Sequence, residues 1–251
     1  MEFITCEARD GVALITLSRA RSNAINDAML VEMTQAVSLA ASDENVRGLV
    51  LASDQPRFFS GGFDVKEVFD YDRERMRDFF GRFIDLYESL HRMPKPVVAA
   101  VNGHAFAGGA IVALAADARV FAEGEYGYAL NEINFGAVLP PGMVRMAIDA
   151  VGLRHARDLL FYGEAVSPAE ALKTGLAKEV VAPESVLERA IAHARALGEK
   201  PRGAFAAVKR SFLEATGHTR SDRQRLEQFL DHWFSPDCEA GKQKILESLR
   251  K

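Results

Sequence analysis

Glu132 is the residue of this sequence whose surroundings best suit acid–base chemistry. It lies in the segment YALNEINFGAVLPPG at 128–142, among apolar and amide side chains, with no Lys or Arg within twelve positions on either side. Apolar surroundings raise the pKa of a carboxyl group because they disfavour its charged form, and a general base working near neutral pH needs such a pKa. On these residues alone, an exposed loop glutamate remains the alternative.

Two glycine pairs could present backbone N–H groups to a ligand. Gly61–Gly62 lie in FFSGGFDVKE at 58–67, and Gly108–Gly109 lie in VNGHAFAGGAIVALAAD at 101–117, at the start of a predicted helix. Glycine lets the backbone turn sharply and approach a ligand closely. The unpaired N–H groups at a helix start can stabilise an oxygen that becomes negative during a reaction. The alternatives are a tight turn for the first pair and a closely packed buried helix for the second.

Several other kinds of catalytic site are disfavoured. The sequence has no G-x-S-x-G segment of a serine hydrolase and no G-x-x-x-x-G-K-[ST] phosphate-binding loop. Its six histidines show no metal-ligand spacing, so no metal is expected. His104, close to the second glycine pair, is expected to be structural.

The composition predicts one large globular domain. The chain has 251 residues, of which 48% are hydrophobic and 26% charged. A net charge of −4 gives no general attraction to nucleic acid or to an anionic membrane, and no apolar run approaches the length of a membrane span. Cys6 and Cys238 form no C-x-x-C pair, so a reducing compartment, the cytoplasm, is expected.

The hydrophobic pattern predicts an α/β core followed by a helical C-terminal region. Short apolar strands alternate with helices in the first half, as is typical of buried parallel strands. Strands are expected at 12–17, 48–52, 96–101 and 117–121, and a further strand precedes the turn at Asp10–Gly11. Helices are expected at 27–41, with Asp27 as N-cap, and at 72–92 and 108–116. From about residue 141 the pattern is mostly helical, with helices at 184–197, 203–215, 220–234 and 236–250.

These segments together resemble the crotonase (enoyl-CoA hydratase/isomerase) superfamily over most of the chain. SNAIN at 22–26 resembles the family's N-terminal segment beside coenzyme A (CoA). FFSGGFDVKE resembles its F-S-x-G-x-D-x-x-E segment, and VNGHAFAGG resembles its N-G-x-x-x-G-G segment. The resemblance implies a ββα spiral core at 1–195 and a helical trimerisation or capping region at 196–251. It also implies a homotrimer or a dimer of trimers.

The resemblance implies roles for particular residues. The backbone N–H groups of Phe63 and Gly108 would form an oxyanion hole for a thioester carbonyl. Asp64, Val65 and Lys66 would lie along the CoA moiety, and Ala24 would contribute a backbone contact near the adenine. The acyl-CoA would be the substrate, and no separate cofactor is expected. Two further suggestions are that Trp233–Phe234 pack near CoA or between subunits and that Lys242 and Lys244 meet its phosphates.

One position indicates which reaction to expect. Hydratases of the family use two glutamates, and Ile111 occupies the position of the first, whereas Glu132 occupies that of the second. Ile cannot transfer a proton, so the resemblance favours the Δ3,Δ2-enoyl-CoA isomerase branch in fatty acid degradation. Hydration, or another crotonase-type lyase or hydrolase reaction, is the alternative. A non-catalytic acyl-CoA-binding or assembly protein is the alternative of another class, and an exposed Glu132 would favour it.

Overall fold

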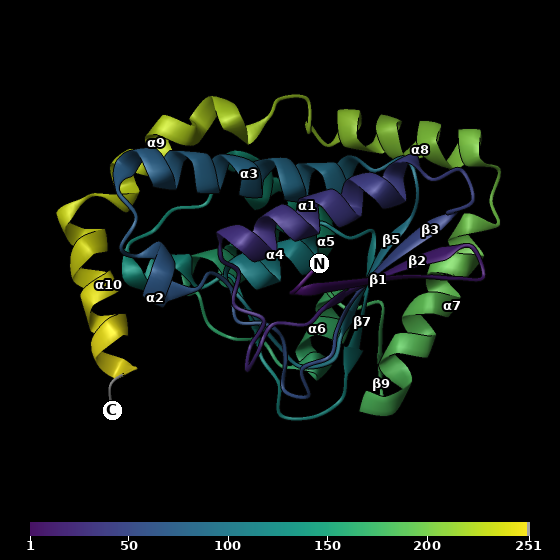
Figure 1. Cartoon of the computed structure of the whole chain (residues 1–251), viewed down its shortest axis with the longest axis horizontal. Helices are drawn as coiled ribbons and strands as arrows, with labels where there is room; N and C mark the ends of the chain where they lie inside the picture. Colours follow the sequence, from purple (N-terminus) through teal and green to yellow (C-terminus); the bar gives the residue numbers. More distant parts are fainter. Residues whose placement is uncertain (250–251) are drawn as a thin grey trace.

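The computed structural model describes residues 1–249 and confirms the α/β fold with its helical C-terminal region (Figure 1). A six-stranded sheet has the order β1-β2-β3-β5-β7-β9, and a three-stranded sheet has the order β4-β6-β8. The strands are β1 (Ile4–Arg9), β2 (Val12–Leu17), β3 (Gly48–Ser53), β4 (Phe58–Ser60), β5 (Val97–Val101), β6 (His104–Phe106), β7 (Ala118–Ala122), β8 (Tyr128–Ala129) and β9 (Glu179–Val181). All pairings are parallel except β1 with β2, which form a hairpin.

Helices and 3-10 helices connect and cover the sheets. They are α1 (Asp27–Ser42), α2 (Val65–Val68), α3 (Arg73–Arg92), α4 (Gly108–Leu114), η1 (Glu132–Phe135), α5 (Pro141–Phe161), α6 (Pro168–Thr174), η2 (Pro183–Ser185), α7 (Val186–Gly198), α8 (Arg202–Ala215), η3 (Asp222–Arg225), α9 (Leu226–Trp233) and α10 (Pro236–Ser248). Among residues 1–249, no helix is both long and apolar enough to cross a membrane.

The expected ββα repeat explains how the two sheets form together. In three successive units, the first strand (β3, β5 or β7) joins the large sheet and the second (β4, β6 or β8) joins the small sheet. A helix follows each pair, so each turn of this spiral adds one strand to both sheets. The loops between second strands and helices therefore gather at one end of the small sheet, where parallel strands end together.

Strand alternation divides the core into two parts. On β3, Leu49 and Leu51 face the larger cluster, which contains α1, α3, α4 and α5, whereas Val50 faces α7. Successive side chains of a strand point to opposite faces, so a strand buried on both sides reads as a continuous apolar run. Helix α7 covers one face of the large sheet, and α10 lies at the opposite end of the molecule (Figure 1).

Several sequence predictions need correction. The N-cap of α1 is Asn26 and not Asp27, because the Asn26 side chain accepts the N–H of Met29. The helix predicted at 220–234 is divided into η3 and α9, and the mostly helical region after residue 141 also contains β9. The hydrophobic pattern did not resolve α5, α6 or the three short strands of the small sheet. Each of these strands has only two or three residues, too few for an alternation with a period of two residues to be recognised. The domain boundary expected at 195 lies within α7, and the division into two regions stays a prediction.

Candidate active site

A cavity of about 580 Å³ brings together Glu132, both expected oxyanion-hole residues and the residues expected along CoA at the N-terminal side. Its lining includes Ala24, Phe63, Asp64, Val65, Lys66, Gly108 and Glu132, and also Ile111. These residues come from the loop before α1, the loop between β4 and α2, the first turn of α2, the first turn of α4, and η1. The spiral therefore brings segments that are far apart in the sequence to one place.

The Phe63 N–H is unpaired because of a local strand pairing. Ile25 and Phe63 form an isolated parallel bridge, in which Ile25 donates to the Gly62 carbonyl and its own carbonyl accepts from Asp64 N–H. In a parallel bridge of this kind, one residue (here Ile25) uses both its backbone N–H and its carbonyl. The N–H and carbonyl of its partner, here Phe63, point away from the edge that the two segments share. Among the described residues, the Phe63 N–H has no hydrogen-bond acceptor, so it is available to a ligand.

Gly108 presents a second unpaired N–H group next to the first loop. It is the first residue of α4, where an N–H has no intrahelical partner, and it has no acceptor within residues 1–249. The preceding Ala107 has φ 47°, an unusual conformation for a residue with a side chain. Gly62, at φ 89°, allows the two loops to meet, because a Cβ there would lie 2.8 Å from the Phe106 carbonyl oxygen and 3.3 Å from the Gly108 nitrogen.

Glu132 is buried at the start of η1, with 8% of its surface exposed. Burial raises its pKa to about 7, and a backbone hydrogen bond only partly opposes this effect. Its Oε2 atom is buried and has no partner within residues 1–249. A buried carboxyl oxygen without a protein partner is free to exchange a proton with a molecule in the cavity. The exposed-loop alternative for Glu132 was therefore wrong.

Arg19 organises the loop before α1 and was missed in the sequence. Its guanidinium donates to the Ala24 carbonyl at 2.6 Å and pairs with the Asp64 carboxylate at 2.7 Å. The side chain of buried Asn23 donates to the Phe59 carbonyl and accepts the Arg19 N–H, which fixes the same loop from inside. These hydrogen bonds of Arg19 and Asn23 join residues that no short sequence motif connects. Only the position of Asn23 inside SNAIN could have suggested a structural role for either residue.

The C-terminal helices supply an apolar wall of the cavity. Its lining includes Phe229 and Trp233 of α9 and Ile245 of α10. Lys242 does not offer its charge to the cavity as the sequence suggested. It is 1% exposed, donates to Glu239 at 2.6 Å, and its Nζ lies 4.4 Å from the centre of the Trp233 ring. Among the two suggested lysines, only Lys244 is exposed.

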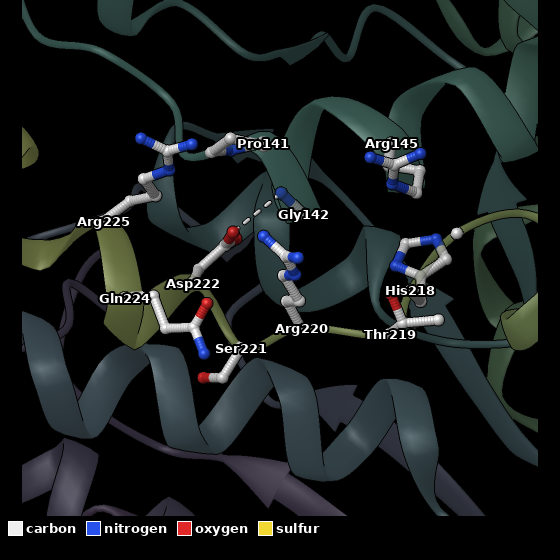
Figure 2. A pocket seen from close by; sticks show the side chains of 11 residues that line it. Pro141, Gly142, Arg145, His218, Thr219, Arg220, Ser221, Asp222, Gln224 and Arg225 are labelled. Atoms are coloured by element: carbon white, nitrogen blue, oxygen red, sulfur yellow. Dashed lines mark hydrogen bonds between the residues drawn. The ribbon is translucent and has the colours of Figure 1, made fainter.

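Two further features lie outside this cavity. His104 is structural as expected, because its Nδ1 accepts the Gly127 N–H at 3.0 Å and its ring packs against Phe58 and Phe106. A second cavity, of about 600 Å³, lies between the start of α5 and the segment 217–225 (Figure 2). It contains none of the residues expected to bind or transform a substrate, so the first cavity is the candidate active site.

The spiral of ββα units, with two unpaired N–H groups and a buried carboxyl around one cavity, defines a crotonase-type α/β protein. The family model described as enoyl-CoA hydratase/isomerase matches residues 7–250. This chain belongs to the enoyl-CoA hydratase/isomerase family.

Relatives of two named activities are similar to this chain. Enoyl-CoA delta isomerase 1, mitochondrial, of Mus musculus is 32% identical over 74% of this chain and 65% of its own length. A mitochondrial enoyl-CoA hydratase of Pongo abelii is 29% identical over 91% of this chain and 79% of its own length. The crystal structure of human mitochondrial delta3-delta2-enoyl-CoA isomerase superposes with a TM-score of 0.93 at 26% identity, covering 99% of this chain and 98% of that chain.

Proposed function

We propose that this protein converts a 3-enoyl-CoA to the trans-2-enoyl-CoA, as in fatty acid degradation. The observation that carries the proposal is the pairing of Glu132, whose pKa is about 7, with Ile111 on the same cavity. One carboxyl group near its pKa can act first as base and then as acid, which a 1,3-proton shift requires. Hydration by two carboxylates would need a second proton donor where Ile111 stands.

The reaction follows from the groups around the cavity. Ionised Glu132 removes a proton from C2, and the electron pair moves into the thioester carbonyl as an enolate. The N–H groups of Phe63 and Gly108 stabilise the enolate oxygen, an effect worth about 3–4 kcal/mol per donor in comparable sites. Protonated Glu132 then returns the same proton to C4 while the double bond forms between C2 and C3, so no water or external proton is consumed.

The remaining lining suits the two ends of an acyl-CoA. Exposed Arg21 and Lys66 are cations on the cavity lining that could meet CoA phosphates. Asp64, also on the lining, is occupied by Arg19 and by capping α2, which leaves Glu132 as the acid–base group. Phe229, Trp233 and other apolar side chains suit the acyl chain.

A paired assay tests the proposal. We expect purified protein to convert a cis-3-enoyl-CoA to the trans-2 isomer and to hydrate trans-2-enoyl-CoA little. Glu132→Gln should retain CoA-ester binding and lose turnover, whereas Glu125→Gln, an exposed glutamate nearby in sequence, should behave as the wild type. Rapid hydration without isomerisation would contradict the isomerase assignment and favour the hydratase alternative. Binding without turnover of either substrate would favour a non-catalytic acyl-CoA-binding protein.

A further inference from the structure

His91, Asp149 and His218 converge from three separate elements. His91 lies in the last turn of α3, Asp149 lies on α5, and His218 lies in the connection between α8 and η3. One nitrogen of each histidine and one oxygen of the aspartate all lie within 4.8 Å of one another. The His218 Nε2 and Asp149 Oδ2 atoms are 2.8 Å apart, and the two imidazole ring centres are 4.5 Å apart. No sequence spacing could have indicated this cluster, since its members are distant along the chain.

His91 leaves a polar atom unsatisfied in this cluster. Its Nε2 is buried and has no hydrogen-bond partner within residues 1–249. A neutral imidazole with a free nitrogen is the commonest metal ligand in proteins. An orphaned buried nitrogen is otherwise costly, which calls for a partner at this position.

The cations near the cluster already have protein partners, as Arg145 has in the Thr216 carbonyl at 3.2 Å. Lys209 is buried and pairs with Asp117 at 2.8 Å. Arg92 donates to the backbone carbonyl of His218 at 2.7 Å. Asp149 is the carboxylate of the cluster, with 14% of its side chain exposed. Its charge balances half of that of a divalent ion, and the imidazoles of His91 and His218 complete a donor set of nitrogen and oxygen.

We propose that His91, Asp149 and His218 bind one divalent transition-metal ion of the zinc class. Nitrogen and carboxylate ligands bind zinc at about 2.1 Å, so tetrahedral ligand atoms are about 3.4 Å apart. The three donor atoms need only small side-chain movements to reach this spacing from their present separations. A water molecule would take the fourth position.

The second cavity gives the ion a path from solvent. His218 lies on its lining beside Arg145 and Thr219 (Figure 2). None of the three ligands lines the candidate active-site cavity. The ion would therefore join α3, α5 and the connection to the C-terminal helices, and its role would be structural.

Metal titration of the chelator-treated whole chain tests the site. We expect one Zn²⁺ per chain by calorimetry or by competition with a chromophoric chelator, a zinc-dependent rise in Tm, and no comparable effect of Mg²⁺, which prefers oxygen ligands. Asp149→Asn and His91→Gln should each weaken zinc binding by no less than the roughly 10–100-fold typical of losing an outer-shell partner. His155→Gln is the matched control, because His155 is an exposed histidine on the same helix as Asp149.

Two results would overturn the proposal. One is the absence of zinc binding and of a Tm rise in the wild type. The other is unchanged zinc affinity in both ligand variants. If either variant fails to fold, Co²⁺ substitution of the wild type decides. Nitrogen and oxygen ligation gives a visible spectrum without thiolate charge-transfer bands, whereas such bands would assign the ion to exposed Cys6 or to Cys238 and refute the site.

Discussion

Replacing Glu132 with glutamine should stabilise the protein at alkaline pH while removing its activity. Glutamine keeps the shape of the side chain but cannot ionise. The wild-type fold must either keep a proton on Glu132 or hold a charge in a buried position, because burial raises the pKa of this group from 4.5 to about 7. In the unfolded chain Glu132 is exposed to water and ionises near pH 4.5. Between pH 4.5 and about 7 the unfolded chain therefore binds fewer protons than the folded protein.

The size and sign of the effect follow from this difference. One pKa unit corresponds to about 1.4 kcal/mol, so the difference between 4.5 and about 7 amounts to roughly 3 kcal/mol. The stability associated with Glu132 is fully present below about pH 4.5 and is lost progressively as pH rises to about 7. The advantage of Glu132→Gln should therefore be smallest near pH 5 and reach about 3 kcal/mol at pH 8. For a chain of this length that is a rise in Tm of about 6–12 °C.

Calorimetric unfolding of both proteins at equal concentration, from pH 5 to pH 8, measures this difference. Other titrating groups are common to both proteins, so they cancel in the comparison. Glu125→Gln, at an exposed position, controls for the general effect of removing a negative charge and should show no pH-dependent gain. A gain that is equal at pH 5 and pH 8 would show that Glu132 is not held neutral by burial, and would refute the reasoning.

Three further outcomes are expected. The kcat/KM for the isomerisation should rise with pH through about 7, as the base form of Glu132 becomes populated, and a profile flat from pH 6 to 8 would exclude that role. Gly62→Ala should lose most turnover and about 1–3 kcal/mol of stability by denaturant unfolding, because its Cβ meets the Phe106 carbonyl at 2.8 Å at a positive φ. Gly152→Ala, also at positive φ but with open space around it, should keep turnover, and equal losses would contradict the steric argument. Arg19→Met should raise KM for the CoA ester several-fold with a smaller change in kcat, because Arg19 holds the Ala24 and Asp64 side of the cavity. Steady-state kinetics measures both constants, and a larger change in kcat than in KM would contradict this role.

The sequence predicted well those features that depend on local pattern. The buried strands at 12–17 and 48–52 and the long helix ending at Arg92 follow from runs and periods of apolar residues, which the structure confirms. The glycine pairs indicated where the backbone bends sharply, and their loops do meet. Arg19 and the Asn26 cap could not be found in this way. Each acts through a contact whose partner is fixed by the fold, and a polar side chain in a sequence does not indicate which of many partners it will reach.

The C-terminal region packs against the element that carries Glu132. The segment around Glu132 is polar enough to be a surface loop, and its own sequence cannot remove it from water. Helix α10 packs directly on η1, which begins at Glu132: a Cβ at Gly241 would lie 2.3 Å from the Phe135 carbonyl oxygen, and one at Gly136 would lie 3.0 Å from the Cys238 backbone. Burial of Lys242 against the Trp233 ring holds α10 in that position. The element that carries Glu132 thus packs against a helix more than a hundred residues later in the chain, at glycines whose importance lies in what they allow to approach.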